Sequence, residues 1–222
     1  MYDTLIFGAG GLGRQVLDIL QLAGHYRPVC FLDSNPALAR TEIGGLPVRG
    51  GLEQLEPLRQ AGLSRAIVAI GDNVTRVALA ETLVRLGFEL VSAIHPLASR
   101  ARSAQVGPHA IIGPRATICV HARLGPHVVM GAGAIAEHDN VLGCGVFLGP
   151  AVRLAGGVTV GDFARLEIGA TVIPGRTIGA GAHVEAGTVV IRDVPPNRLA
   201  AGVPAVVAGQ ARSGFVAREA RG

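Results

Sequence analysis

Residues 106–147 read VGPHAI-IGPRAT-ICVHAR-LGPHVV-MGAGAI-AEHDNV-LGCGVF, seven consecutive six-residue units, and the same phase continues to Val190. A large aliphatic residue opens the unit at fourteen of fifteen positions, and the small Ala136 is the exception. The fifth residue of a unit is usually small, as at Ala110, and glycine often holds the second place, as at Gly107. A period of six matches neither an α-helix nor a flat strand, and it is typical of a stacked coil.

The repeat therefore predicts a parallel β-helix with a triangular cross-section, each side of which uses one unit. The aliphatic residue fills the interior, the small residue fits a tight corner, and glycine or a polar residue takes the dihedral angles of the turn. Three units close a coil, so residues 106–190 predict between four and five coils.

The chain before residue 95 has a different organisation, in which short apolar runs alternate with amphipathic segments as in βαβ units. We predict strands at 4–7, 29–33, 66–70 and 89–94 and helices at 12–23, 52–61 and 74–86. Gly8–Gly13 matches G-x-G-x-x-G between a strand and a helix, and Asp33 follows twenty residues later. Such a loop can place a phosphate at a helix N-terminus and an acid near a ribose. About 95 residues supply only half of a full dinucleotide fold.

Composition excludes several classes of protein. The net charge is +4, and the basic residues, all arginine, are scattered, which argues against nucleic-acid binding. Three cysteines lack metal-type spacing and do not suggest a disulfide framework. No apolar run reaches the length of a membrane span, and no leader is apparent, so we expect no membrane partner and a cytoplasmic location.

The most polar part of the repeat follows its one irregular position. After Ala136 the chain reads Glu137-His138-Asp139-Asn140. A neutral imidazole is a suitable general base near pH 7, and a neighbouring carboxylate can orient it and raise its basicity. We interpret His138 as a base, with Asp139 or Glu137 as the orienting carboxylate.

Three other histidines, His109, His121 and His127, share the fourth place of their units. We predict that they are stacked corner residues on the exterior. A metal site built from them between subunits is the alternative. We expect no metal.

Several motifs in order resemble one acyltransferase family. The opening Leu5–Gly11, Phe31-Leu32-Asp33, Ala69–Asn73 and Ile94-His95-Pro96 precede the repeat, and Gly202–Ala205 follows it. This order resembles the hexapeptide-repeat acetyltransferases that include sialic-acid O-acetyltransferases and nucleotide-sugar N-acetyltransferases. The resemblance implies a half-Rossmann α/β domain at 1–95, an all-β left-handed parallel β-helix at 96–208 and a tail at 209–222. It also implies a homotrimer that holds acetyl-CoA between neighbouring β-helices.

The resemblance further implies the roles of particular residues. His138 is the catalytic base, followed by the acidic Asp139. Nucleotide-sugar positions are Gly10, Gly11, Leu12, Asp33, Ser34 and Gly71, and acetyl-CoA positions are Phe147, Ile168 and Ala186. Gly156 and Gly157 would let the thioester approach closely. Family members often carry His where this chain has Leu12 and Phe147.

The sequence thus predicts acetyl transfer from acetyl-CoA to the amine of an amino-sugar nucleotide. O-acetylation of a sugar such as a sialic acid needs the same base and stays open. A metal-dependent hydratase, a non-catalytic nucleotide-sugar-binding protein and a nicotinamide oxidoreductase are alternatives from other classes.

Overall fold

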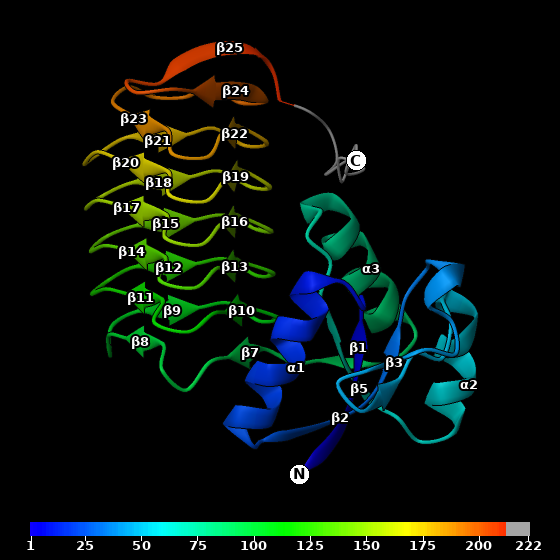
Figure 1. The fold of residues 1–222 in the computed structure, drawn as a ribbon. Helices are drawn as coiled ribbons and strands as arrows, with labels where there is room; N and C mark the ends of the chain where they lie inside the picture. The colour runs from blue at the N-terminus through cyan, green and yellow to red at the C-terminus, as the bar shows by residue number, and fades with distance from the viewer. Residues whose placement is uncertain (212–222) are drawn as a thin grey trace.

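The computed structural model describes residues 1–211 and shows a β-helix beside a smaller α/β domain (Figure 1). The α/β domain is built on a four-stranded parallel sheet. Its strands, in spatial order, are β2 (Tyr26–Leu32), β1 (Tyr2–Phe7), β5 (Arg65–Val68) and β6 (Glu89–Leu90). The order reverses between β1 and β5, and in open α/β sheets ligands bind outside the carboxyl ends of the strands at such a point.

Helices cover both faces of this sheet. The domain contains α1 (Gly11–Ala23), α2 (Leu55–Gln60), α3 (Asn73–Arg85), the 3-10 helices η1 (Pro36–Leu38) and η2 (Leu52–Gln54), and a hairpin of β3 (Glu42–Ile43) and β4 (Leu46–Pro47). Ile6 and Ile67 pack with α1 on one face, and the same cluster includes Ile111 and Val129 of the β-helix. Leu5 and Val68 pack with α2 and α3 on the other face. The α/β domain therefore shares an apolar core with one side of the β-helix.

Three parallel sheets form the sides of the β-helix. The first, sheet C, contains β7 (Ala93–Ile94), β10 (Ile111–Ile112), β13 (Val129–Met130), β16 (Phe147–Leu148), β19 (Arg165–Leu166), β22 (His183–Val184), β24 (Arg198–Ala201) and the antiparallel β25 (Val206–Gln210). The second, sheet D, contains β8 (Ser99–Arg100), β11 (Thr117–Ile118), β14 (Ile135–Ala136), β17 (Arg153–Leu154), β20 (Thr171–Val172) and β23 (Val189–Val190). The third, sheet E, contains β9 (Gln105–Val106), β12 (Arg123–Leu124), β15 (Val141–Leu142), β18 (Thr159–Val160) and β21 (Thr177–Ile178).

The interior of the β-helix follows the repeat. The first and fifth residues of the units form one continuous buried cluster that includes Ile112, Leu148, Ala110 and Ala164. Successive coils pair eighteen residues apart, as Ile112 pairs with Met130. The predicted triangular packing is confirmed.

The glycines of the repeat divide between two places of the unit. Positive φ falls at the fourth place, in glycines such as Gly133 (65°), as predicted for the turn, and also in other residues such as Arg115 (56°) and Ala151 (56°). The recurrent glycine at the second place serves close approach instead: a Cβ at Gly107 would lie 2.6 Å from the backbone of Gly125 in the next coil. The second place of the unit thus meets the need for close packing, and the fourth place adopts the positive φ of the turn.

Other expectations differ in detail. The predicted strand at 89–94 is two strands: β6 pairs with β5, whereas β7 pairs with β10 in the β-helix. The β-helix begins before Val106, at β7 in sheet C and β8 in sheet D. Sheet D therefore contains six strands, more than the four to five coils predicted from residues 106–190. Within the predicted tail, Gly209 and Gln210 belong to β25, and residues 212–222 lie outside the described part.

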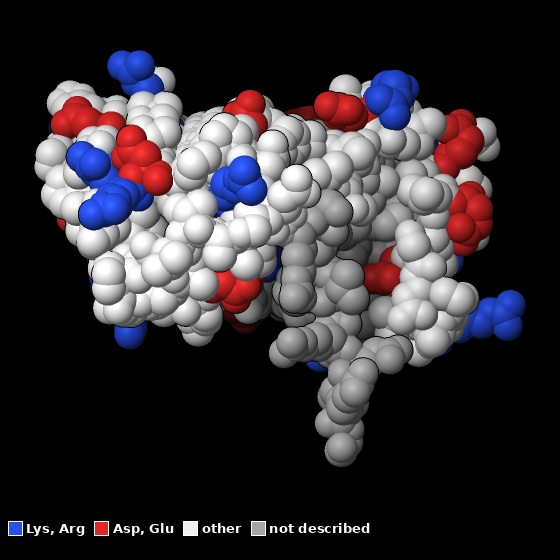
Figure 2. Space-filling view, turned by 90° about the horizontal axis from the view of Figure 1, so that it is seen from above, with Lys and Arg blue, Asp and Glu red and all other residues white. Residues whose placement is uncertain are grey.

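Two surface properties bear on partners. Acidic and basic side chains are interspersed on the face seen from the C-terminal end of the β-helix (Figure 2). Among residues 1–211, no helix is both long and apolar enough to cross a membrane.

Candidate active site

His138 lies at the corner between sheets D and E, in the turn that joins β14 to β15. Its Nδ1 is 2.8 Å from Oδ2 of Asp139, and both side chains are more than half exposed. Asp139 has the positive φ of its place in the unit (59°). The backbone N–H of His138 donates to Glu137 Oε2 at a long 3.4 Å.

The imidazole of His138 lies over the next coil. Gly156 is eighteen residues further along, and its missing Cβ would fall 2.3 Å from His138 Nε2. Gly157 donates its N–H to the carbonyl of His138 and has a positive φ (68°), with open space where a side chain would stand. The two predicted acetyl-CoA glycines therefore adjoin the candidate base.

The predicted nucleotide-sugar residues cluster where the sheet order reverses. Gly10 is the N-cap of α1, whose first turn has no side-chain cap and no acidic residue, and a Cβ at Gly10 or Gly11 would meet nothing within 4 Å. Exposed N–H groups at such a helix terminus favour a phosphate. Leu12 is half-buried and packs against the shared apolar cluster, so it offers no polar group.

Asp33 holds the glycine-rich loop in place. Its Oδ2 accepts the N–H of Ala9 at 2.8 Å, and its Oδ1 accepts the N–H of Asn35 at 2.8 Å. Asp33 and Ser34 also border an open hollow of about 340 Å³, which Leu52 and Glu53 of η2 line as well. The carboxylate thus joins two loops at the carboxyl ends of β1 and β2.

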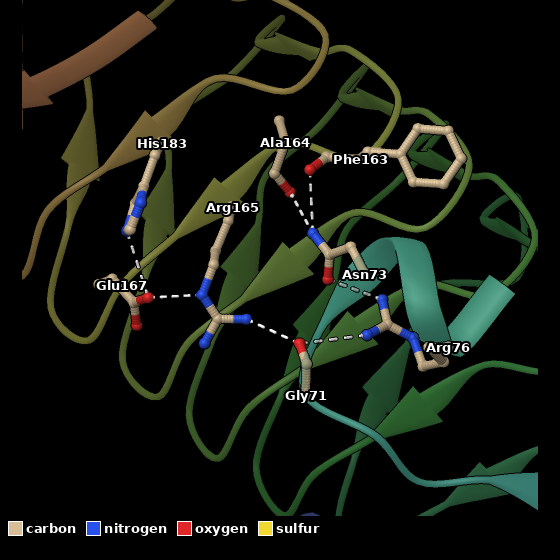
Figure 3. Close-up of polar contacts among 8 residues, drawn as sticks. All are labelled: Gly71, Asn73, Arg76, Phe163, Ala164, Arg165, Glu167 and His183. Carbon is tan, nitrogen blue, oxygen red and sulfur yellow. Dashed lines mark hydrogen bonds and ion pairs between the residues drawn. The ribbon is translucent and has the colours of Figure 1, made fainter. Parts of the chain in front are cut away.

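The loop after β5 is fastened to the β-helix (Figure 3). The carbonyl oxygen of Gly71 accepts Arg165 Nη1 at 2.8 Å, and Asn73 donates its amide to the carbonyl oxygens of Phe163 and Ala164. These bonds connect the predicted nucleotide-sugar loop directly to the sheet C side of the repeat.

Arg76 anchors the same loop from α3 and is fully buried. Its guanidinium donates to oxygens of Ile70, Gly71, Asn73, His127 and Gly145. Burial lowers the pKa of Arg76 to about 10, and the nearby positive charge of Arg165 adds to this effect. Sequence inspection missed Arg76, because an arginine in a helix usually faces solvent.

The predicted acetyl-CoA residues other than the glycines lie on sheet C and the corner that follows it. Phe147 is half-buried, and the guanidinium of Arg165 stacks on its ring at 4.0 Å. Ile168 and Ala186 are exposed and occupy successive coils, where Gly187 N–H donates to the Ile168 carbonyl oxygen at 2.9 Å. They do not adjoin His138, which lies at the other end of sheet D.

Glu167 and His183 extend the polar group around Arg165 (Figure 3). Glu167 pairs with Arg165, and His183 Nε2 lies 3.3 Å from Glu167 Oε1. Hydrogen bonds from His183 and Arg165 hold the pKa of Glu167 below its ordinary value. Sequence inspection did not connect His183 with these residues, because they lie on the preceding coil and are distant along the chain.

The prediction that His109 is an exterior corner residue is wrong. His109 is buried between the domains, its Nε2 accepts the N–H of Val68, and its Nδ1 lies 2.8 Å from Nδ1 of His127. Burial lowers the pKa of His109 to about 3. The α/β domain covers this corner, which the repeat alone could not reveal. Among the described residues, no group of three or more His, Cys, Asp or Glu is placed to hold a metal ion.

Comparison with known proteins agrees with this architecture. Residues 3–83 match the family model of the PglD N-terminal domain. A GDP-perosamine N-acetyltransferase of Escherichia coli O157:H7 is 30% identical over 211 residues, which cover 90% of this chain and 93% of that protein.

Solved structures give the same result. PerB from Caulobacter crescentus, in complex with CoA and GDP-perosamine, is 41% identical with a TM-score of 0.88, covering 94% of this chain and 98% of that one. The acetyltransferase domain of PglB from Neisseria gonorrhoeae, in complex with acetyl coenzyme A, is 30% identical with a TM-score of 0.87, covering 93% and 98%.

The fold is a half-Rossmann domain followed by a left-handed β-helix, as the resemblance implied. The chain belongs to the family of hexapeptide-repeat nucleotide-sugar acetyltransferases. One of the similar proteins is named a GDP-perosamine N-acetyltransferase. Another is an acetyltransferase domain in complex with acetyl coenzyme A. The predicted family and enzyme class are confirmed, and both solved neighbours, PerB and the PglB domain, bind CoA or acetyl coenzyme A.

Proposed function

We propose that this chain transfers the acetyl group of acetyl-CoA to the primary amine of an amino-sugar nucleotide, with GDP-perosamine as the first candidate substrate. Two relatives that match nine-tenths or more of the chain are named for that substrate or bind it, which favours N-acetylation over O-acetylation. The open N-terminus of α1 and the hollow beside Asp33 suit the diphosphate and the nucleoside.

The observation that carries the chemistry is the contact of His138 Nδ1 with Asp139. If Nδ1–H donates to the carboxylate, the tautomer is fixed and Nε2 keeps the lone pair that accepts a proton. The amine nitrogen attacks the thioester carbonyl carbon, Nε2 takes the ammonium proton, and the C–S bond breaks to release CoA thiolate. The proton can then pass to the sulfur. The thioester is already activated, so no acyl-enzyme is needed. Glu137 is the secondary candidate for orienting the turn.

The two halves of the site belong to different subunits in this proposal. The α/β domain packs on sheet C, whereas His138 lies at the corner between sheets D and E, on the side of the β-helix away from that domain (Figure 1). A nucleotide-sugar held at Gly10, Gly11, Asp33, Ser34 and Gly71 would therefore meet the His138 of a neighbouring copy. A homotrimer supplies that neighbour, and Phe147, Ile168 and Ala186 would line the groove for acetyl-CoA.

The test is thiol release from acetyl-CoA with a panel of GDP- and UDP-linked amino sugars, free amino sugars and sialic acid. Mass spectrometry of the product distinguishes an amide from an ester. We expect turnover with an amino-sugar nucleotide, and His138→Ala should lower kcat by about 10²–10⁴-fold, the usual contribution of a positioned base. His25→Ala, at an exposed histidine of the α/β domain, is the control. Transfer only to hydroxyl groups, or full activity of His138→Ala, would contradict the proposal.

A further inference from the structure

Gly156 stands where the β-helix does not need a glycine. It is the third residue of its unit, and other units carry alanine there, at Ala132, Ala180 and Ala186. Gly156 is not among the residues with positive φ, so its backbone suits an L-residue. No backbone atom is among the three nearest to its missing Cβ. The fold therefore tolerates a side chain at this position, and the reason for glycine lies elsewhere.

The space that a side chain would fill is taken by the imidazole of His138. A Cβ on Gly156 would lie 2.3 Å from Nε2, 2.4 Å from Cε1 and 3.0 Å from Cδ2 of that ring. Real Cβ contacts essentially never fall below 3.0 Å, so a methyl group must displace the imidazole. Because the ring ends a flexible side chain, the displacement costs the fold little, whereas it moves Nε2 directly.

From the interior of the β-helix, Asn140 fixes the distance between the His138 imidazole and Gly156. Asn140 is fully buried at a place where most other units have alanine or valine, and it follows the small Ala136, the one irregular aliphatic position. Its Nδ2 donates to the carbonyl oxygen of Ala155 at 2.8 Å and to that of His138 at 3.4 Å. One side-chain amide thus ties the turn that carries the imidazole to the residue before Gly156.

We infer that Gly156 and Asn140 are positioning residues that together hold the His138 imidazole in its reactive place. Asp139 holds the ring at Nδ1, the bare Cα of Gly156 supports its other edge, and Asn140 keeps the two coils in register. This inference rests on the proposed role of His138. It gives Gly156 a function in the ligand-free protein, before any thioester arrives.

Gly156→Ala is the direct test, with Gly133→Ala as the matched control. Gly133 has positive φ and open space around its missing Cβ, and Ala151, one coil further on, already adopts that conformation as alanine. We expect Gly156→Ala to fold with a melting temperature close to that of the parent, and Gly133→Ala to fold with a slightly lower one, because alanine is strained at positive φ. Gly156→Ala should lower kcat about tenfold or more with little change in KM for acetyl-CoA, since small misplacements of a catalytic group are costly. Gly133→Ala should keep the parental kcat.

A second readout separates this role from simple access of the thioester. In the ligand-free protein, the ¹⁵N imidazole resonances of His138 should shift in Gly156→Ala and stay unchanged in Gly133→Ala. Asn140→Ala should shift them as well. Unchanged His138 resonances, combined with a raised KM for acetyl-CoA, would overturn the inference and assign Gly156 to the thioester.

The two proposals can fail separately. In a His138→Ala background, adding Gly156→Ala should have no further effect on residual transfer, because the group that it displaces is absent. If His138→Ala is fully active, the catalytic proposal fails, while the resonance shifts still report whether Gly156 and Asn140 hold the ring. An added loss in the double variant would overturn the positioning role.

Discussion

The β-helix and the α/β domain reveal their candidate site residues in different ways. In the β-helix successive coils repeat the same pattern, so a departure from the repeat stands out: Ala136 and Asn140 lie within two residues of His138 in the chain, and Gly156 lies against its ring. In the α/β domain no such background exists, and the site is made by loops at the end of a sheet. A regular scaffold therefore reveals its site through exceptions, whereas an irregular one reveals it through motifs.

The junction between the regions combines polar and apolar contacts. Arg76, His109 and Asn73 bond across it, and Ile111 and Val129 join the apolar cluster of α1. If the site requires the nucleotide-sugar loop at a fixed place on the repeat, then removing a bonding group from this junction should destabilise the folded protein. The size of that effect should follow how deeply the group is buried and how many hydrogen bonds it makes.

The largest effect on stability is expected for Arg76→Met. The change leaves the buried carbonyl oxygen of Gly145 and the partly buried ones of His127 and Ile70 without their donor, and a fully buried unsatisfied group costs about 1–3 kcal/mol. Relief of the buried charge offsets part of this, so we expect a loss of about 2–4 kcal/mol in the free energy of unfolding. Urea denaturation measures it. Arg85→Met, at an exposed arginine of the same helix, is the control, and an equal loss in both variants would refute the anchoring role.

The second-largest loss of stability at the junction is expected when the pH is lowered. His109 has a pKa of about 3 in the folded protein against an ordinary value of 6.5, so the unfolded chain binds its proton first as pH falls. Stability that is present above pH 6.5 is then lost towards pH 3, by about 1.4 kcal/mol per pH unit for this one group. Urea titrations between pH 7 and pH 5 should show a shallower slope in His109→Gln than in the parent. Equal slopes would show that His109 does not titrate in this way.

The smallest effect on stability is expected from the contact between Phe147 and Arg165. Phe147→Leu removes the ring under the Arg165 guanidinium, and such a contact contributes about 0.5–1 kcal/mol. A double-mutant cycle with Arg165→Met measures the coupling in free energy of unfolding. Zero coupling would mean that the stacking is incidental to the junction.

Much of this could be predicted from the sequence, because a period of six restricts the fold and places His138 at a corner. The parallel strands of the α/β domain were predicted from apolar runs, except that 89–94 divides between two sheets where the chain crosses to the β-helix. The burial of His109 and the anchoring by Arg76 could not be predicted, since both depend on how the domains dock. The contact of His138 with Gly156 also needed the structure, although eighteen residues separate them as one coil requires.

The most direct test of the central claim is complementation between two inactive variants. His138→Ala lacks the base, and Asp33→Ala weakens the nucleotide-sugar loop; each alone should show little thiol release. Co-expressed with different tags and purified as mixed trimers, they should regain roughly a third of parental activity, because every mixed trimer keeps one of its three interfaces with both groups intact. Mixed oligomers no more active than their parents would contradict a site shared between the repeat of one subunit and the α/β domain of the next.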